Sequence, residues 1–362
     1  MPPRGEYSQR RRRLAAELER RKLDAVIVTA LPNIRYLSGF TGSNAALLAT
    51  AAGDAVLFTD PRYQIQAADE ADCRVRVVKG SLLKALLETA RRKGLCRLGF
   101  EAQRLSFAEH EMLRAGLWLG AWLEPQTGLI EDLRMVKSPA ELEAIRGAMQ
   151  IASRAFCEAL CIARPGVLEI ELAAEIEYRM RRLGAEKPAF DSIVLGGART
   201  ALPHARAGRE PLRANELVLV DVGAVKAGYS SDMTRMAFLG RPDERVKRLY
   251  EAVREAQQAA LEAVRPGLAA DVVDRAARRL LAGHGLERAF VHSTGHGLGL
   301  EIHEAPRLGK GERLRLAAGM VVTVEPGAYL EGFGGVRIED TIVVTSNGCE
   351  ILTPASKELL AL

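Results

Sequence analysis

The same order of elements occurs twice in the C-terminal part of this sequence, and this repeat limits the possible folds more than any other feature. A helical stretch ends at Arg164-Pro165-Gly166, a second helix runs to about Gly184, and two strands that carry acidic residues follow. A later helical stretch ends at Arg265-Pro266-Gly267, another helix runs to about Gly283, and two more acidic strands follow. A chance likeness of two helix-rich stretches is the alternative. The repeat predicts two related halves that bring their acidic strands to one central place.

Each strand pair carries two carboxylates. The first pair holds Asp221 and Asp232, and the second holds Glu325 and Glu339. Apolar residues alternate along these strands, so we expect the two acids of each pair to face each other across a hairpin. Directly opposed residues have Cβ atoms about 4.5–5.5 Å apart, which suits carboxylates shared by metal ions about 3.5–4 Å apart. A single buried acid often serves another purpose, but four in this arrangement favour a metal centre.

Histidines are few and concentrated between the two acidic pairs. Of the six in the chain, four lie within one short segment, namely His284, His292, His296 and His303, and His204 lies in an earlier loop. Carboxylates with one imidazole suit divalent ions such as Mn, Co or Zn. The other imidazoles can hydrogen-bond or transfer protons near neutral pH. The pattern therefore predicts a two-metal hydrolytic centre, from which we leave out His284 and His110 as surface or satisfied core residues.

Arg337 belongs to the same pattern. It lies two residues before Glu339, so the alternation of a strand points both side chains to one side. A guanidinium in that place can hold a ligand carboxylate in a fixed orientation.

The N-terminal part has a different pattern. Short apolar runs alternate with helical stretches at 81–93 and 106–115; the runs are 25–28, 45–48, 55–58 and 75–78. This alternation is typical of a small α/β domain. Ser138-Pro139-Ala140-Glu141 then begins a new helix with a capping box and a proline at its first position. We therefore expect the α/β (α+β) fold class, with one domain at 1–130 and a second at 131–362.

Composition and charge narrow the location and the partners. The chain of 362 residues has 51 Lys and Arg against 46 Asp and Glu, an imbalance too small to suggest a nucleic-acid partner. The most basic run, Arg10 to Arg13, has helical spacing and predicts a solvated helix face. No signal-peptide core follows it, no apolar run reaches about 18 residues, and the five cysteines lack the spacing of secreted scaffolds. We expect a cytoplasmic protein without a membrane partner.

Short motifs in both parts of the chain resemble one known family. In the N-terminal part they are 33–44 and 58–63. In the C-terminal part they are 190–194, 202–204, 228–232, 292–299, 302–306, 324–327 and 336–340. Together they resemble the Xaa-Pro peptidases of the pita-bread fold, the group of prolidase and aminopeptidase P. The resemblance implies a small N-terminal α/β domain of the creatinase/prolidase type followed by a pseudo-twofold pita-bread catalytic domain.

The resemblance also implies a set of metal ligands. Asp221 would chelate one divalent ion, while Asp232 and Glu339 would bridge two. His296 and Glu325 would complete the second site. The two ions would be Mn, Co or Zn, and they would turn a bridging water into the hydroxide that attacks the scissile carbonyl.

The remaining roles implied by the resemblance are catalytic. Glu325 would carry a proton from the attacking water to the leaving nitrogen. His292 and His303 would stabilise the substrate carbonyl and the developing oxyanion. His204 would guide the substrate and proton transfer, and Arg337 would orient the bridging carboxylates.

Four functions compete on this fold. The favoured one is a metallopeptidase that hydrolyses the N-terminal bond of short Xaa-Pro peptides. A methionine aminopeptidase shares the ligands but does not need the domain before Ser138. A creatinase-like enzyme works without metal, and a non-enzymatic binding protein typically lacks ligands, whereas the ligand set here is complete.

The preference for dipeptides or longer peptides, the native metal and the residue favoured before proline remain open in the sequence. We expect a homodimer, in which the N-terminal domain of a neighbouring subunit could close the far end of the cleft. Apolar residues such as Leu298 and Leu300 are expected to form walls for the proline ring.

Overall fold

The computed structural model describes residues 5–362, which form two compact units. The first extends to Arg134 and the second from Met135 to Leu362, four residues beyond the boundary at residue 130 that the sequence predicts. None of the helices in the described part of the chain is long and apolar enough to cross a membrane.

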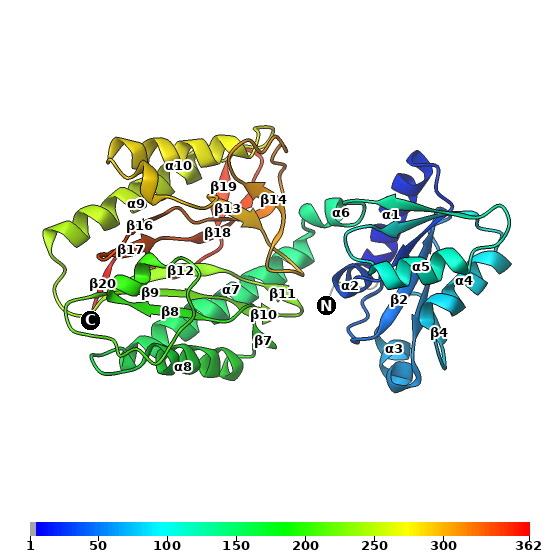
Figure 1. Ribbon diagram of the computed structural model, residues 1–362, viewed down its shortest axis with the longest axis horizontal. Helices are drawn as coiled ribbons and strands as arrows, with labels where there is room; N and C mark the ends of the chain where they lie inside the picture. The colour runs from blue at the N-terminus through cyan, green and yellow to red at the C-terminus, as the bar shows by residue number, and fades with distance from the viewer. Residues whose placement is uncertain (1–4) are drawn as a thin grey trace. The chain divides into compact units, whose positions relative to one another are not determined.

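The N-terminal unit is built on a six-stranded sheet with the strand order β4-β3-β2-β1-β5-β6 (Figure 1). Its strands are β1 (Ala25–Val28), β2 (Ala45–Thr50), β3 (Ala55–Thr59), β4 (Arg74–Val77), β5 (Arg97–Glu101) and β6 (Trp122–Gln126). Its helices are α1 (Glu6–Arg20), α2 (Leu31–Ser38), α3 (Gln64–Glu70), α4 (Leu82–Arg92) and α5 (Phe107–Ala115), and α6 (Glu131–Met135) spans the boundary. The sheet is mixed, because β2 runs antiparallel to β1 and β3 while the other neighbours pair in parallel. The predicted α/β domain is confirmed.

The basic run in α1 is not a wholly solvated face, so that expectation was wrong for two of its arginines. Arg10 and Arg11 are buried and donate hydrogen bonds to the carbonyls of Tyr36 (3.0 Å) and Leu37 (2.8 Å). These carbonyls belong to the last turn of α2, where main-chain acceptors lack partners within the helix. Positive charge is also favourable at a helix C-terminus. The run therefore holds α2 in place, and only its other two arginines are exposed.

The C-terminal unit repeats one order of elements, as the sequence predicted. The first half contains α7 (Pro139–Ala159), α8 (Glu169–Arg182), β9 (Leu217–Val222) and β12 (Met233–Phe238). The second contains α9 (Glu244–Ala263), α10 (Asp271–Gly283), β15 (Val321–Val324) and β18 (Asp340–Val344). Figure 1 shows α9 and α10 on one flank of the strands and α7 and α8 on the other. Ser138 caps α7 in a capping box with Glu141, as expected.

Shorter elements complete this unit. The remaining strands are β7 (Lys187–Pro188), β8 (Ile193–Gly196), β10 (Ala224–Lys226), β11 (Tyr229–Ser230), β13 (Gly295–Gly297), β14 (Glu304–Leu308), β16 (Gly327–Leu330), β17 (Gly334–Arg337), β19 (Cys349–Ile351) and β20 (Leu360–Ala361). The larger sheets have the orders β20-β12-β9-β8 and β14-β13-β15-β18-β19.

Strand β9 shows how the core positions an acid. Leu217 and Leu219 pack in the core with α9 and α10, whereas Val218 and Val220 pack in the core with α7 and α8. A strand that is covered on both faces needs a continuous apolar run, and this one ends in Asp221. By alternation, Asp221 shares the face of Leu217 and Leu219. Asp221 therefore lies near the end of a strand that is buried on both faces.

The register of the first hairpin differs from the expected one. Thr234, and not Asp232, pairs with Asp221, because Lys226 pairs with Tyr229 around a two-residue turn. Both turn residues, at 227 and 228, have positive φ (49° and 79°), as a tight hairpin turn of type I′ requires. Asp232 lies directly before β12, two residues away from the position that faces Asp221.

The register of the second hairpin agrees with the prediction. Val324 pairs with Asp340 on one side of the acids, and Gly327 pairs with Arg337 on the other. Glu325 and Glu339 lie between these pairs and therefore stand opposite each other.

Candidate metal centre

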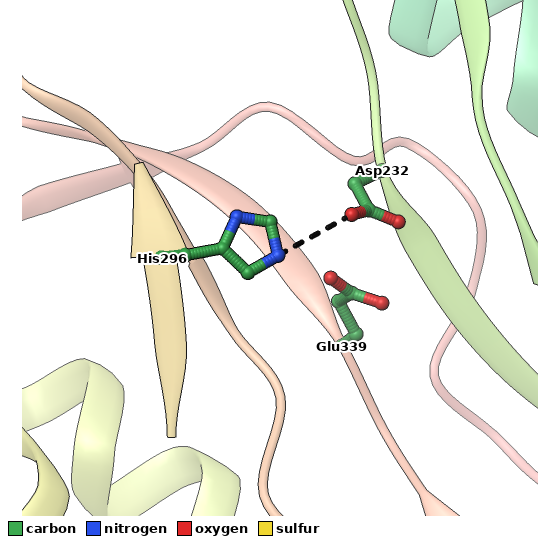
Figure 2. A group of neighbouring side chains, drawn as sticks. All are labelled: Asp232, His296 and Glu339. Atoms are coloured by element: carbon green, nitrogen blue, oxygen red, sulfur yellow. Dashed lines mark ion pairs between the residues drawn. The ribbon is translucent and has the colours of Figure 1, made fainter. Parts of the chain in front are cut away.

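Four carboxylates and one imidazole converge where strands of the two halves end. Asp221 lies near the end of β9 and Asp232 directly before β12, while Glu325 directly follows β15 and Glu339 directly precedes β18. Figure 2 shows Asp232, His296 and Glu339 pointing toward one another, and one ligand atom from each lies within 4.8 Å of the others. His296 Nε2 is 3.6 Å from Asp232 Oδ2 and 3.5 Å from Glu325 Oε1. These distances leave room for a cation between the side chains.

His296 is oriented as a metal ligand would be. Its Nδ1 donates to the carbonyl of Gly297 at 3.0 Å, which leaves the lone pair of Nε2 facing the carboxylates. Burial lowers the pKa of His296 to about 4, so the ring is neutral at physiological pH. The preceding Gly295 lets β13 approach β15, because a Cβ there would collide with the carbonyl oxygen of Thr323. A neutral imidazole with a free nitrogen is the form that binds metals.

The acids repel one another in a buried place. Burial, followed by the charge of neighbouring acids, raises the pKa of Asp232 and of Glu339 well above the usual range. Burial also raises the pKa of Glu325 to about 7, and the charge of Asp221 contributes. Divalent cations among these groups would offset both the repulsion and the loss of hydration.

Asp221 has one oxygen that lacks a partner. Its Oδ2 accepts a hydrogen bond from Arg337 Nη2 at 2.6 Å. Its Oδ1 is buried and accepts no hydrogen bond from any residue in the described part of the chain. A buried acceptor without a partner costs about 1–3 kcal/mol, which a ligand to that oxygen would remove. The residues present therefore fit a divalent metal ion.

Arg337 organises this side of the site, but through a different partner than expected. It is buried, and its direct carboxylate partner is Asp221. Its Nε donates to the Thr234 hydroxyl at 2.9 Å, and that hydroxyl donates to Glu339 Oε2 at 2.7 Å. Its Nη1 donates to the hydroxyl of Tyr329 at 3.0 Å. Arg337 thus reaches Glu339, a predicted bridging ligand, through an intervening threonine.

Both ring nitrogens of His292 are engaged. Nδ1 donates to the carbonyl of Ser293 at 2.8 Å, so Nε2 of the neutral ring accepts from the Tyr329 hydroxyl at 2.8 Å. Burial lowers the pKa of His292 to about 4. In this tautomer Nε2 carries no proton, so His292 can donate a hydrogen bond to a substrate carbonyl only if the Tyr329 hydroxyl moves away and Nε2 gains a proton.

Sequence reasoning missed Tyr329, although a signal for it exists. Tyr329 lies four residues after Glu325 in the same hairpin and pairs with Gly335 across it. A Cβ on Gly335 would crowd the Tyr329 ring, so the glycine makes room for the phenol. The alternation that identified Glu325 therefore identifies Tyr329 as well.

His303 and His204 are exposed beside the buried ligands. The His303 ring lies 4.4 Å from the His296 ring, centroid to centroid, in an edge-to-face arrangement. Burial and the nearby His204 lower the pKa of His303, and the charge of His204 also contributes to the lowered pKa of His292. The charge of His303 also contributes to the lowered pKa of His296, so His303 acts on a proposed ligand, whereas His204 acts on the neighbouring histidines.

The expectation that Leu298 forms a wall for the proline ring was wrong. Leu298 is fully buried and packs in an apolar cluster with Val321, and Leu300 packs against the same cluster. The Leu298 side chain is therefore not free to line a cleft, whereas Leu300 is partly exposed. The exposed apolar side chains next to the histidines in sequence are Leu202 (50% exposed) and Val291 (67% exposed).

Comparison with known proteins agrees with this geometry. Residues 143–346 match the model of metallopeptidase family M24, and residues 10–136 match the creatinase/prolidase N-terminal domain. A Pyrococcus horikoshii protein named Xaa-Pro dipeptidase is 37% identical, over 95% of this chain and 96% of its own length.

Two solved structures are similar over nearly the whole chain. An Xaa-Pro dipeptidase from Bacillus anthracis is 37% identical with a TM-score of 0.95 and covers 98% of this chain and 100% of its own. An X-Pro aminopeptidase from Thermotoga maritima is 35% identical with a TM-score of 0.91, covering 97% and 99%. These similarities confirm the fold that the sequence motifs implied, with a creatinase-type α/β domain followed by a pita-bread domain.

Proposed function

Because this chain belongs to metallopeptidase family M24, we propose that it uses two divalent metal ions to hydrolyse the N-terminal bond of short Xaa-Pro peptides. The observation that carries the proposal is the cluster of carboxylates around His296, near which Asp221 Oδ1 is buried without a hydrogen-bond partner among residues 5–362. The names of the relatives, Xaa-Pro dipeptidase and X-Pro aminopeptidase, support the substrate class.

Five side chains would hold the ions. Asp221 would bind one of them, Asp232 and Glu339 would be shared, and His296 with Glu325 would complete the other. When bound, two divalent ions supply Lewis acidity and lower the pKa of an attacking water. Mn, Co and Zn all suit this donor set.

Glu325 is the acid best placed to carry a proton. Its side chain is 16% exposed, against 12% for Asp221 and 8% for Asp232, so it is the most accessible of these three to a bound substrate. A carboxylate there can take a proton from the attacking water and deliver it to the leaving nitrogen.

The exposed histidines would act on the substrate. His303 would donate a hydrogen bond to the oxygen on which negative charge develops, and His204 would guide the substrate and a proton. His292 would join them only after Tyr329 releases its Nε2 and that nitrogen gains a proton. The side chains of Leu202 and Val291 would replace the buried Leu298 as walls for the proline ring.

Proline explains why a dedicated peptidase is useful. An Xaa-Pro bond has no N–H, and the ring fixes the backbone angle φ, so a general peptidase handles it badly. A site shaped for the ring gains selectivity from the same features. A methionine aminopeptidase does not need an additional N-terminal domain. The presence of such a domain in this chain therefore also favours the Xaa-Pro function.

A cleavage panel tests the proposal. The protein is stripped of metal, reloaded with Mn, Co or Zn, and assayed on Ala-Pro, Ala-Pro-Ala, Ala-Ala-Ala and Met-Ala-Ser. We expect Ala-Pro or Ala-Pro-Ala to be cleaved much faster than the proline-free peptides, and only after reloading. Equal rates with and without proline would contradict the Xaa-Pro assignment, and preference for Met-Ala-Ser would favour a methionine aminopeptidase.

The location and assembly are part of the same proposal. All five cysteines are free thiols, which fits the reducing conditions of the cytoplasm. We expect a homodimer, and its molar mass in solution would be twice the 39.4 kDa of one chain.

A further inference from the structure

Two buried threonines contact the carboxylates of the proposed metal centre, and neither is itself a candidate ligand. We propose that Thr234 and Thr323 are positioning residues, each of which fixes one ligand carboxylate by relaying a hydrogen bond from a group that can only donate. This inference rests on the proposed two-metal function. It concerns the orientation of the Glu339 and Glu325 carboxylates. A side chain as long as glutamate does not keep one orientation without hydrogen-bond partners.

Thr234 lies between Arg337 and Glu339. Its hydroxyl oxygen accepts from Arg337 Nε at 2.9 Å and donates to Glu339 Oε2 at 2.7 Å. A guanidinium has no acceptor, so the hydroxyl must accept from it. The single proton of the hydroxyl then points to Glu339, whose Oε2 can only accept. Arg337 thus sets the donor-to-acceptor direction of both hydrogen bonds.

Thr323 makes the corresponding arrangement on the other side. Its hydroxyl accepts from the main-chain N–H of His296 at 3.0 Å and donates to Glu325 Oε1 at 3.2 Å. An amide N–H also only donates, so the hydroxyl proton again points to a carboxylate. Through Thr323, the position of His296 and the rotation of Glu325 are linked.

Burial makes both relays specific. Thr234 and Thr323 are fully buried, where no solvent can offer a competing partner. In each case one carboxylate oxygen is held by the hydroxyl, and its remaining lone pairs are free for cations. Hydrogen bonds of this kind to metal ligands restrict their rotation and contribute to metal affinity.

A third threonine provides a contrast. Thr341 follows Glu339 by two residues, as Thr234 follows Asp232, and is also fully buried. Its hydroxyl donates to the main-chain carbonyl of Asp232 at 2.7 Å. Thr341 therefore holds a strand, whereas Thr234 and Thr323 hold carboxylates.

The test compares isosteric and conservative substitutions. Thr234→Val and Thr323→Val remove the hydroxyl, while Thr234→Ser and Thr323→Ser keep it. The matched control is Thr59→Val in the N-terminal unit, where a fully buried hydroxyl donates to the main-chain carbonyl of Asn44 at 2.7 Å. The readouts are Mn²⁺ affinity of the full-length metal-free protein, by calorimetry, and its thermal unfolding without metal.

We expect each valine variant to bind Mn²⁺ about 10–100-fold more weakly, with the serine variants close to wild type. Thr59→Val should lose thermal stability and keep wild-type Mn²⁺ affinity. Wild-type Mn²⁺ affinity in a valine variant would overturn the proposal for that residue. An equal loss of Mn²⁺ affinity in Thr59→Val would also overturn it, because the weaker binding would then come from general destabilisation. A wild-type protein that binds no divalent ion would instead overturn the proposed function itself.

Discussion

Arg337 and Asp221 form a buried ion pair in which Nη2 lies 2.6 Å from Oδ2, while Oδ1 of the same carboxylate faces no donor from residues 5–362. The pair fixes the carboxylate and leaves one oxygen free to bind a cation. The same guanidinium also contacts Tyr329 and Thr234. The Arg337 guanidinium thus holds a carboxylate, a phenol and a threonine hydroxyl around the proposed centre.

Arg337→Lys tests this arrangement. Lysine keeps the charge but lacks the planar fork that contacts three partners at once. We expect metal affinity or turnover to fall by about 10–100-fold, measured by calorimetry and by initial rates on Ala-Pro. Arg12→Lys, at an exposed position, is the control. Wild-type affinity and turnover in Arg337→Lys would show that the fork geometry is unimportant.

The metal-free protein should lose stability at alkaline pH. The folded-state pKa values of Asp232, Glu325 and Glu339 are raised, so stability from these groups is present at low pH and is lost as pH rises through the folded pKa values. The histidines oppose this effect only below about pH 6.5, because the lowered pKa values of His292 and His296, both about 4, restore stability as pH rises to that point.

Above pH 6.5 the acids therefore dominate. Urea midpoints measured in chelator should fall between pH 6.5 and 8.5, and metal-loaded protein should not show this fall, because cations replace the protons. A flat profile in chelator would contradict the predicted repulsion among the acids.

Tyr329→Phe should change the titration of His292. The phenol hydroxyl donates to Nε2 of that ring, and a protonated ring could not accept this bond. Without the hydroxyl, the pKa of His292 should rise from about 4 toward its ordinary value. Histidine Cε1–H signals followed by NMR over pH would report it, with His284, exposed on the surface, as an internal reference. An unchanged His292 titration would mean that burial alone sets its pKa.

His303→Ala should separate catalysis from metal binding. His303 is exposed, and we propose that it stabilises the oxyanion, a role worth about 10²–10³ in rate. We expect normal metal content with turnover reduced by that factor. Unchanged turnover would make His303 a structural neighbour of His296.

Local patterns in the sequence were enough to predict much of this molecule. The repeat around the two Arg-Pro-Gly segments, the capping box at Ser138 and the opposed positions of Glu325 and Glu339 all follow from neighbouring residues. The cap and the hairpin each depend on a signal within a short stretch of sequence, and the repeat depends on two such stretches that have the same order of elements.

The errors concern features that depend on distant parts of the chain or on turn geometry. The first hairpin closes with Ala227 at positive φ, which sequence does not reveal for a residue other than glycine, and Thr234 rather than Asp232 then faces Asp221. Arg10 is buried because α2 offers it a carbonyl acceptor 26 residues away. The Leu298 side chain is buried because it packs in the apolar cluster that contains Val321. Thr234 and Tyr329 escaped notice because neither residue type signals a metal site by itself.

Metal content of the wild type and of Asp232→Asn is the most direct test of the two-metal centre. Asp232 is proposed to be shared by both ions, and its carboxylate lies 3.6 Å from His296 Nε2. We predict two ions per chain in the wild type and loss of stable double occupancy in Asp232→Asn, together with loss of Xaa-Pro hydrolysis. A variant that still holds two ions per chain with normal turnover would contradict a shared role for Asp232 and the centre built around it.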